Sequence, residues 1–360
     1  MTARQSRRSV ADIYELSPMQ EAMLFHCTYA PESRAYFDQF SCRIEGLSRP
    51  DDFRESWQTL SDRHAVLRTS FHWQDLPKPM QVVHESVVVP WTFEDWSHLN
   101  ASGQSEKWQG LLEEDRKIGF VLEQAPLFRC KLARLNSDTC LFAWSHHHII
   151  LDGWCLSLIL SEIFETYNGL GRNQRPAAKT VPRYRDYIVW LQAQDQTSAR
   201  EFWAGELKGS SAPTELSAIS PIRGHRSGGS DSRLSAVLSE ERSTELRSFA
   251  AHRQLTINTL VQGAWSVLLH RYSGESDILF GATVSGRSAD VTGIEQMLGV
   301  FINTIPIRVH VDPDSELVPY LKKLQELQAF RSRNAFLSLK DIRQSGGIPH
   351  GSSLFHTNLI

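Results

Sequence analysis

Residues 144–154 of the chain have the sequence WSHHHIILDGW. An apolar run typical of a buried strand leads into three consecutive histidines, and an aspartate and a glycine precede an apolar helix. Because side chains alternate in direction along a strand, His146 and His148 are expected on one face and His147 on the other. The segment therefore places titratable side chains at a strand end, a common location for a catalytic base.

Three interpretations of the histidines follow from their chemistry. A neutral His148 is suited to accept a proton near pH 7, which favours a general base. Three histidines and Asp152 also have metal-ligand chemistry, although neighbouring histidines on alternating faces do not converge on one ion. In the third interpretation Asp152 caps the following helix and His148 is a buried, hydrogen-bonded imidazole with a structural role. The residues alone leave these alternatives open.

Outward from this segment, helical and strand patterns alternate, which predicts an α/β protein. The run Ser17-Pro18-Met19-Gln20 predicts a capped helix start, because serine and glutamine at this spacing form a capping box. A half-buried strand is predicted with Phe40, Cys42 and Ile44 on one face. Further strands are predicted around residues 80–84, 127–135 and 140–145, the last two as a hairpin. An apolar helix follows Gly153. Gly169, Gly171, Asn173 and Pro176 are expected to end it, and a lobe boundary is placed there, between residues 172 and 173. The predicted lobes are residues 1–172 and 173–360.

The second half of the chain continues the same alternation. Strands are predicted over residues 234–238, 278–284 and 304–311, and a helix is predicted to begin at the cap residue Thr256. A further helix is expected over residues 316–330. Residues 354–360 resemble the start of a strand, and we therefore expect the second lobe to lack C-terminal structure.

Composition excludes several classes of protein. The 360 residues are 41% hydrophobic and 22% charged, with a formal net charge of −3, so no basic field predicts a nucleic-acid partner. No apolar run is long enough to span a membrane, and none follows the basic start as a signal segment would. The five cysteines form no CxxC pair, which favours free thiols and a cytoplasmic location.

A second candidate residue is Arg287, which follows a predicted buried strand. Two alternatives are open for this arginine. It either pairs with Asp152 across the two lobes or lies exposed in a loop. No GxSxG, phosphate-binding glycine loop or HExxH motif occurs in the sequence.

Five segments together resemble a known family. They match the signature segments of condensation domains in nonribosomal peptide synthetases, whose HHxxxDG motif also occurs in related acyltransferases of the chloramphenicol acetyltransferase fold. The segments occur in the family's order and are residues 16–26 (LSPMQEAMLFH), 63–71 (RHAVLRTSF), 147–153 (HHIILDG), 184–190 (YRDYIVW) and 299–304 (GVFINT), the last followed by Arg308.

The resemblance implies an α/β fold of two chloramphenicol-acetyltransferase-like lobes in a V arrangement with a central tunnel. It also implies an acyltransferase. The amine of an acceptor aminoacyl thioester attacks a donor aminoacyl or peptidyl thioester, and an amide forms. The implied partners are the donor and acceptor peptidyl carrier proteins and a neighbouring adenylation domain. Both substrates are attached to the 4′-phosphopantetheine arms of the carrier proteins, and the resemblance implies no resident cofactor and no metal.

The resemblance also implies roles for residues. His148, Asp152 and Gly153 form the implied catalytic set. His148 either acts as a general base or positions the amine and stabilises the tetrahedral state. Asp152 is expected to hold the loop by pairing with Arg287, and the Gly153 backbone N–H is expected to face the reacting carbonyl.

The other motif residues are expected to be structural. His147 is assigned to the framework, and Arg63, Arg68 and Asn303 are expected to pack or to line the tunnel. Residues 334–340 replace the family's HQDLPFE-like segment, and this variant, together with the LSPMQEAMLFH opening, resembles subtypes that accept a D-configured donor. Two further functions are kept as alternatives: a stand-alone acyltransferase that uses coenzyme A thioesters, and a non-catalytic module that docks carrier proteins.

Overall fold

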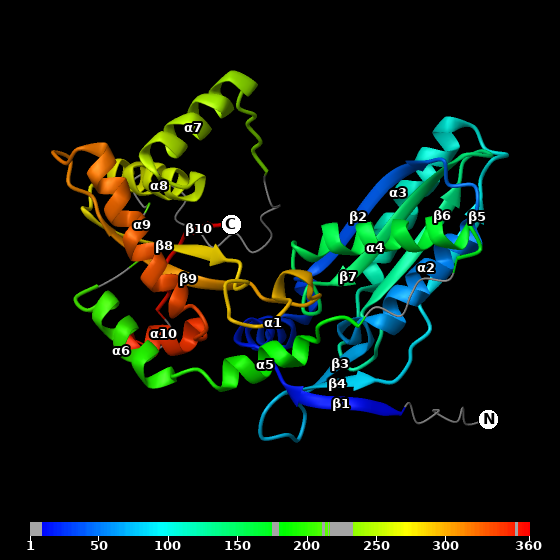
Figure 1. The fold of residues 1–360 in the computed structure, drawn as a ribbon, viewed down its shortest axis with the longest axis horizontal. Helices are drawn as coiled ribbons and strands as arrows, with labels where there is room; N and C mark the ends of the chain where they lie inside the picture. The colour runs from blue at the N-terminus through cyan, green and yellow to red at the C-terminus, as the bar shows by residue number, and fades with distance from the viewer. Residues whose placement is uncertain (1–8, 175–179, 211–212, 215, 217–232, 350–351) are drawn as a thin grey trace. The chain divides into compact units, whose positions relative to one another are not determined.

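The structure is a computed structural model that describes residues 9–174, 180–210, 213–214, 216, 233–349 and 352–360 (Figure 1). It divides into two compact units, Met1–Gln194 with Ala289–Ile302, and Asp195–Ser288 with Asn303–Ile360. The basic start of the chain lies outside the described residues. Each unit combines helices and sheet, as the sequence predicts, whereas the V arrangement and the tunnel stay predictions.

The division differs from the predicted lobe boundary between residues 172 and 173. Helix α5 (Tyr184–Gln192) belongs to the first unit, where the Tyr184 hydroxyl donates a hydrogen bond of 2.7 Å to the Val300 carbonyl. The segment Ala289–Ile302, from the second half of the sequence, also returns to the first unit. A boundary read from helix breakers misses both features, because they depend on contacts between distant segments.

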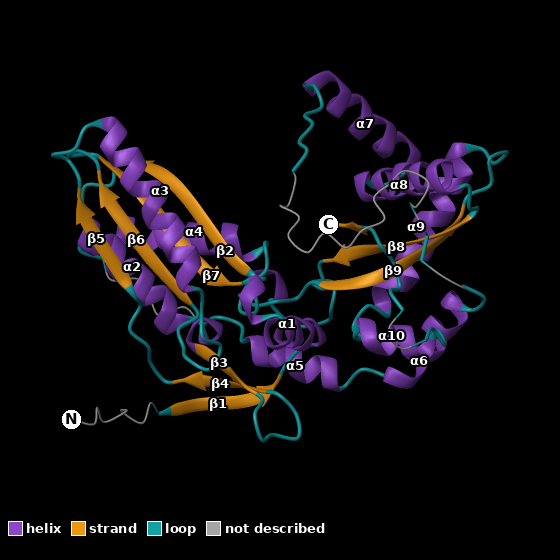
Figure 2. Cartoon of the chain, turned by 180° about the vertical axis from the view of Figure 1, so that it is seen from behind, coloured by secondary structure: helices purple, strands orange, loops and turns teal. Residues whose placement is uncertain are grey.

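The first unit is built on a four-stranded sheet in the order β2-β7-β6-β5 (Figure 2). Its strands are β2 (Phe37–Glu45), β5 (Trp91–Asp95), β6 (Phe128–Arg134) and β7 (Thr139–His147). Strand β7 pairs antiparallel with both β2 and β6, and β5 pairs parallel with β6. The predicted hairpin is thus formed by β6 and β7, and β7 extends two residues beyond its predicted end.

Side chains of β7 alternate between two cores. Phe142 and Trp144 pack with helices α2 (Pro50–Arg63) and α4 (Cys155–Leu170) on one face of the sheet. Ala143 packs with Trp108 of α3 (Ala101–Ile118) on the other face. Since both faces are covered, the strand that leads to the histidines is fixed from two sides.

The first unit also contains a smaller sheet. This antiparallel sheet has the order β1-β4-β3, with β1 (Val10–Glu15), β3 (Thr69–His72) and β4 (Met80–His84). Helix α1 (Pro18–Tyr29) begins with the predicted capping box, in which Gln20 N donates to the Ser17 hydroxyl and Ser17 N donates to the Gln20 side chain. Short 3₁₀ turns occur at Pro31–Ser33, Ala65–Arg68 and Ile294–Gln296.

The second unit contains a sheet in the order β10-β8-β9. Its strands are β8 (Asp277–Val284), β9 (Asn303–His310) and β10 (Asn358–Leu359), with β8 antiparallel to β9 and parallel to β10. Its helices are α6 (Gln196–Leu207), α7 (Glu240–Arg253), α8 (Ile257–Ser273), α9 (Leu317–Arg333) and α10 (Leu339–Ser345). Thr256 caps α8 as predicted, because its hydroxyl accepts the Thr259 N–H.

One predicted strand is wrong. Residues 234–238 form no strand, and the Leu234 and Val237 side chains are 98% and 96% exposed. The apolar pattern predicts a strand, but a strand needs a hydrogen-bonded neighbour, and none pairs with this segment in the described part of the chain.

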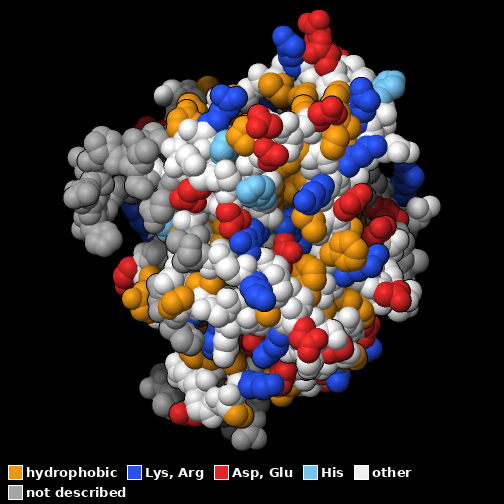
Figure 3. All heavy atoms as spheres, turned by 90° about the vertical axis from the view of Figure 1, so that its left-hand side faces the viewer, with side chains coloured by type: hydrophobic (Ala, Val, Ile, Leu, Met, Phe, Trp, Pro, Cys, Tyr) orange, Lys and Arg blue, Asp and Glu red, His pale blue; other side chains and the backbone are white. Residues whose placement is uncertain are grey.

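The surface carries charge of both signs. On the face drawn in Figure 3, acidic and basic side chains are interspersed among apolar ones. Within the described ranges, every helix is too short or too polar to cross a membrane.

Candidate active site

The pairing of β2 with β7 places the first residues of β2 beside the histidines at the end of β7. In this register Asp38 lies opposite His146, and Phe37 lies opposite His147. Strand β7 ends at His147, and a turn begins at His148, whose backbone N–H donates a 2.8 Å hydrogen bond to the Tyr36 carbonyl. The turn is therefore fixed to the start of β2 at the residue where the candidate base stands.

The hydrogen bond of the His148 ring determines its tautomer. Nδ1 lies 2.5 Å from the Leu151 carbonyl oxygen. A carbonyl oxygen only accepts, so Nδ1 carries the proton, and the neutral ring keeps a lone pair on Nε2. A neutral His148 thus presents a basic nitrogen on the side of the ring away from the loop.

The ring lies in a pocket of the first unit of about 300 Å³. His146, His148, Asp152 and Gly153 all line it, and Asp38 contributes a carboxylate. The other lining residues are Gln39, Phe40, Trp144 and Leu156. The His148 side chain is 25% exposed, which leaves it accessible. The implied catalytic set therefore surrounds one pocket, hereafter the His148 pocket.

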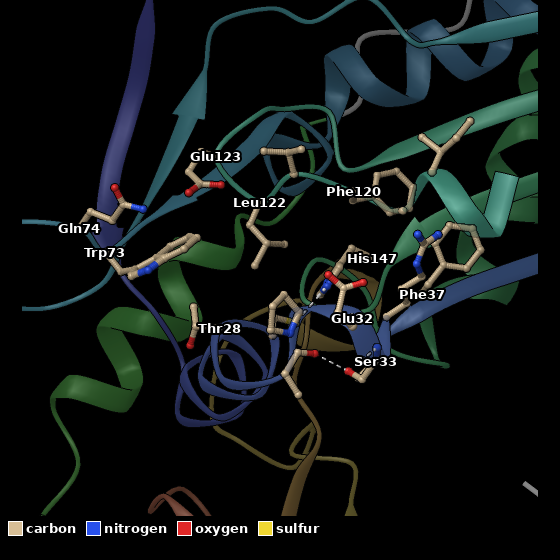
Figure 4. A pocket seen from close by; sticks show the side chains of 18 residues that line it. Thr28, Glu32, Ser33, Phe37, Trp73, Gln74, Phe120, Leu122, Glu123 and His147 are labelled. Atoms are coloured by element: carbon tan, nitrogen blue, oxygen red, sulfur yellow. Dashed lines mark hydrogen bonds between the residues drawn. The ribbon is translucent and has the colours of Figure 1, made fainter. Parts of the chain in front are cut away.

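His147 points into a different pocket, of about 580 Å³, as the alternation along β7 predicts (Figure 4). Its Nδ1 accepts the Ile149 backbone N–H at 3.1 Å, so Nε2 carries the ring proton and faces Cys27 Sγ at 3.5 Å. This tautomer is opposite to that of His148. His147 has no lone pair to offer to Cys27, and its contacts support a structural role.

Burial holds two of the histidines neutral. It lowers the pKa of His146 to about 3, and the neighbouring His148 and His147 charges lower it further in the same direction. Burial and the His148 charge lower the pKa of His147 to about 4. The His146 ring also stacks on Trp144, with a centroid distance of 4.5 Å. Both residues therefore remain uncharged near neutral pH.

These pKa values predict a specific acid sensitivity. Below the ordinary histidine value of 6.5 the unfolded chain binds protons that folded His146 and His147 do not, so stability falls as pH falls from 6.5 toward 3. Each histidine is expected to contribute a loss of about 2 kcal/mol at pH 5. We expect His147→Asn, whose Oδ1 still accepts the Ile149 N–H, to lose about 2 kcal/mol less than the parent between pH 7.5 and 5. Urea denaturation measures both losses, and equal losses would contradict the assignment.

Asp152 anchors the loop that follows the histidines. Its carboxylate accepts the Phe301 backbone N–H at 2.9 Å and lies 3.3 Å from Cys155 Sγ, and its own N–H donates to the Gly299 carbonyl at 3.2 Å. Asp152 is only 4% exposed, and the residue at the cap position of α4 is Trp154. Asp152 therefore ties the loop to the segment Ala289–Ile302 and does not occupy the helix cap.

Replacing Asp152 by alanine is expected to destabilise the first unit by about 1–3 kcal/mol, because the buried Phe301 N–H loses its acceptor. Asp152→Asn retains an acceptor oxygen and is expected to lose less. The melting temperatures of the two variants separate these effects. An Asp152→Ala protein as stable as the parent would contradict the anchoring role, and an equal loss in Asp152→Asn would show that the charge itself matters.

Two other motif segments pack against this anchor. Gly299 contacts Tyr184 so closely that a Cβ there would lie 2.2 Å from a Tyr184 ring carbon. The Tyr184 ring also packs edge-on against Phe301, with centroids 5.3 Å apart. The motif at residues 184–190 and residues 299–302 of the later motif thus support the histidine loop.

The other predicted residues lie away from the His148 pocket. Arg63 pairs with Glu162 of α4, and Arg68 donates to backbone carbonyls that include Ser61 at 3.0 Å. The Asn303 side chain donates to the Ala335 and Leu337 carbonyls, both at 2.7 Å, inside the second unit. These contacts are structural.

Arg287 is buried in the second unit. Its expected ion pair with Asp152 stays a prediction.

Asp38 is the pocket residue that sequence reasoning missed. Its Oδ2 lies 3.6 Å from His146 Nε2 and 3.9 Å from His148 Nδ1. The available signal was an aspartate two residues before Phe40 of a predicted strand. Its position opposite His146 depends on the β2–β7 register, which one strand's pattern does not specify.

The histidines do not assemble a metal site. Within the described residues, no group of three or more histidine, cysteine, aspartate or glutamate side chains is arranged to hold a metal ion. The five cysteines are free thiols.

Comparisons with known proteins identify the family of the chain. The profile of the family described as "Condensation domain" matches residues 10–359. A linear gramicidin synthase polypeptide of Brevibacillus parabrevis is 41% identical over 355 residues, which are 98% of this chain and 7% of that protein. The chain thus spans a small part of the relative's length.

Solved structures show the same fold at low identity. The first condensation domain of the calcium-dependent antibiotic synthetase, in complex with a substrate analogue, has a TM-score of 0.75 and 18% identity over 97% of this chain and 80% of that one. A four-domain nonribosomal peptide synthetase bound to AMP and glycine has a TM-score of 0.73 and 21% identity over 97% of this chain and 26% of that one. The chain belongs to the condensation domain family, and its fold is the chloramphenicol-acetyltransferase-like fold of these domains.

Proposed function

We propose that the chain forms amide bonds in nonribosomal peptide synthesis, joining a donor aminoacyl or peptidyl thioester to the amine of an acceptor aminoacyl thioester. Family membership and similarity to a linear gramicidin synthase support this reaction. The observation that carries it is the His148 ring, whose Nδ1 proton is bound by the Leu151 carbonyl and whose basic Nε2 is left for substrate. The His148 pocket supplies the space around that nitrogen.

In the proposed step the acceptor amine attacks the donor carbonyl carbon. The new C–N bond forms, and the C–S bond of the donor thioester then breaks. His148 Nε2 accepts a hydrogen bond from the amine, takes its proton as the tetrahedral intermediate forms, and returns it to the departing thiolate. No covalent acyl-enzyme is required. The same hydrogen bond orients the amine, so positioning and proton transfer share one atom.

Gly153 leaves open space at the His148 pocket. It lines the His148 pocket, and no atom outside its immediate neighbours lies within 4 Å of the place where a Cβ would stand. An alanine there would occupy pocket space without meeting protein. This supports the expectation that substrate approaches the backbone at Gly153.

Gly153→Ala is therefore expected to leave the melting temperature within about 2 °C of the parent, because the added methyl meets no protein atom. The rate of amide formation is expected to fall at least about tenfold, because the methyl occupies substrate space. Thermal unfolding and a product assay measure the two effects. An unchanged rate would show that substrate does not approach this residue.

The proposed partners are a donor and an acceptor peptidyl carrier protein, each with a 4′-phosphopantetheine arm, and the adenylation domain of the same synthetase. The chain's similarity to part of a four-domain synthetase supports this setting. The five free cysteines support the proposed cytoplasmic location.

Two assays separate this function from its alternatives. The donor group is supplied either on a carrier protein or as a free coenzyme A thioester, and the acceptor either on a carrier protein or as a free amino acid. We expect product from the two carrier proteins. Equal turnover with coenzyme A thioester and free amine would indicate a stand-alone acyltransferase, and carrier binding without product would indicate a docking module.

A further inference from the structure

We propose that Asp38 is a positioning residue for His148, whose carboxylate stabilises the imidazolium formed when His148 takes the proton of the acceptor amine. This inference rests on the proposed function, in which His148 Nε2 is the proton acceptor. Asp38 touches no reacting atom in this proposal and acts through the His148 ring.

The geometry places the charge beside the ring without a hydrogen bond. Asp38 Oδ2 lies 3.9 Å from His148 Nδ1, which is too far for a hydrogen bond, and the Nδ1 proton is already donated to the Leu151 carbonyl. The carbonyl fixes the orientation of the ring, and Asp38 adds a charge that acts through space. The Leu151 carbonyl thus orients the His148 ring, whereas the Asp38 carboxylate changes the stability of its charged form.

Strand pairing keeps the carboxylate in place. The β2–β7 register sets Asp38 opposite His146. His146 is the residue before the last residue of β7, and the turn begins two residues after it, at His148. Both Asp38 and His148 line the His148 pocket, and the Asp38 side chain is 46% exposed. Partial exposure keeps the carboxylate in contact with water, which stabilises its ionised form.

The other titratable groups near the ring do not neutralise Asp38. His146 Nε2 lies 3.6 Å from Asp38 Oδ2, but the pKa of about 3 keeps His146 neutral. His147 faces the opposite pocket, and the Asp152 carboxylate is engaged with the Phe301 N–H. Burial raises the pKa of Asp38, and a positive charge on His148 opposes that rise. The coupling between Asp38 and His148 therefore depends on the charge of His148.

The first test is the pH–rate profile of Asp38→Asn. Only the neutral His148 ring accepts the amine proton, so the rate falls on the acidic side of the profile. Without the Asp38 charge the imidazolium is less stable, so we expect the acidic limb to move to lower pH and the plateau rate to fall about three- to tenfold. Asp38→Glu is expected to restore part of the shift.

A matched control uses the same strand. Glu45→Gln removes one negative charge from the other end of β2, opposite Thr139, and should leave the acidic limb in place. An acidic limb that stays in place in Asp38→Asn, or that moves equally in Glu45→Gln, would overturn the proposal. A structural role for Asp38 alone would lower the rate at all pH values without moving the limb.

The second test needs no turnover. Carbon-13 NMR of labelled aspartate follows the Asp38 carboxyl, whose signal is assigned by its loss in Asp38→Asn. Because the His148 charge lowers the pKa of Asp38, we expect that pKa to rise in His148→Gln. An unchanged value would overturn the coupling. If the chain forms no amide, this experiment still decides the Asp38–His148 interaction and so separates it from the proposed function.

Discussion

Replacing His148 by alanine is expected to reduce the rate of amide formation by roughly 10²–10⁴-fold, the range of a lost general base. The substitution removes Nε2 from the pocket together with the Nδ1 bond to Leu151. Intact-mass spectrometry of the acceptor carrier protein measures the rate directly. The fold is expected to survive, because the ring is partly exposed and the turn keeps its backbone bond to Tyr36.

The control for this variant is His98→Ala, which truncates an exposed histidine between Trp96 and α3. It should retain the parent rate, and both variants should have the parent's circular dichroism spectrum. A His148→Ala protein with more than about a third of the parent rate would contradict proton transfer at Nε2.

Replacing Asp115 by alanine is expected to produce the largest loss of stability, about 3–5 kcal/mol. Asp115 is fully buried, and its carboxylate is bonded to Arg129 at 2.5 Å and to the Ser145 hydroxyl. The Gln39 side chain also donates to it at 3.1 Å. Its removal would leave the Arg129 charge without its carboxylate, and would remove the acceptor that Gln39 of β2 and Ser145 of β7 share.

Burial alone would raise the pKa of Asp115, but the Ser145 hydrogen bond and the Arg129 and Lys131 charges outweigh it and hold the pKa below its ordinary value. The carboxylate therefore contributes stability above the ordinary aspartate pKa, and this contribution is lost as pH falls through the folded value. Asp138→Ala, at an exposed hairpin position, is the control and is expected to stay within about 0.5 kcal/mol of the parent. Urea denaturation at pH 7 compares them, and similar midpoints would show that Asp115 is not required.

The sequence predicted the helix starts and the hairpin, because these features depend on residues that are close together in the chain. The capping box at Ser17 and Gln20, the cap at Thr256 and the hairpin of β6 and β7 depend on residues close in sequence. The strand over residues 234–238 was wrong, because an alternating pattern does not supply the neighbour that a strand requires. The packing of Gly299 against Tyr184 and the return of Ala289–Ile302 to the first unit depend on distant contacts.

The candidate site shows the same limit. Alternation along β7 predicted that His146 and His148 share a face, and both line the His148 pocket while His147 lines the other. The tautomers were beyond the sequence, because they depend on which backbone group each Nδ1 meets. Asp38 was missed for a related reason, since its neighbours are set by the register between two strands that are far apart in the sequence.

Intact-mass spectrometry of an acceptor carrier protein shows whether His148 drives amide formation. The acceptor, loaded with its amino acid, is mixed with a donor carrier protein and this chain, with L- and D-configured donors supplied separately. We predict that the acceptor gains the mass of the donor acyl group with the parent chain, more rapidly from the D-configured donor. The gain should be nearly absent with a folded His148→Ala protein. Equal gains with the parent and His148→Ala would contradict the claim that His148 drives amide formation.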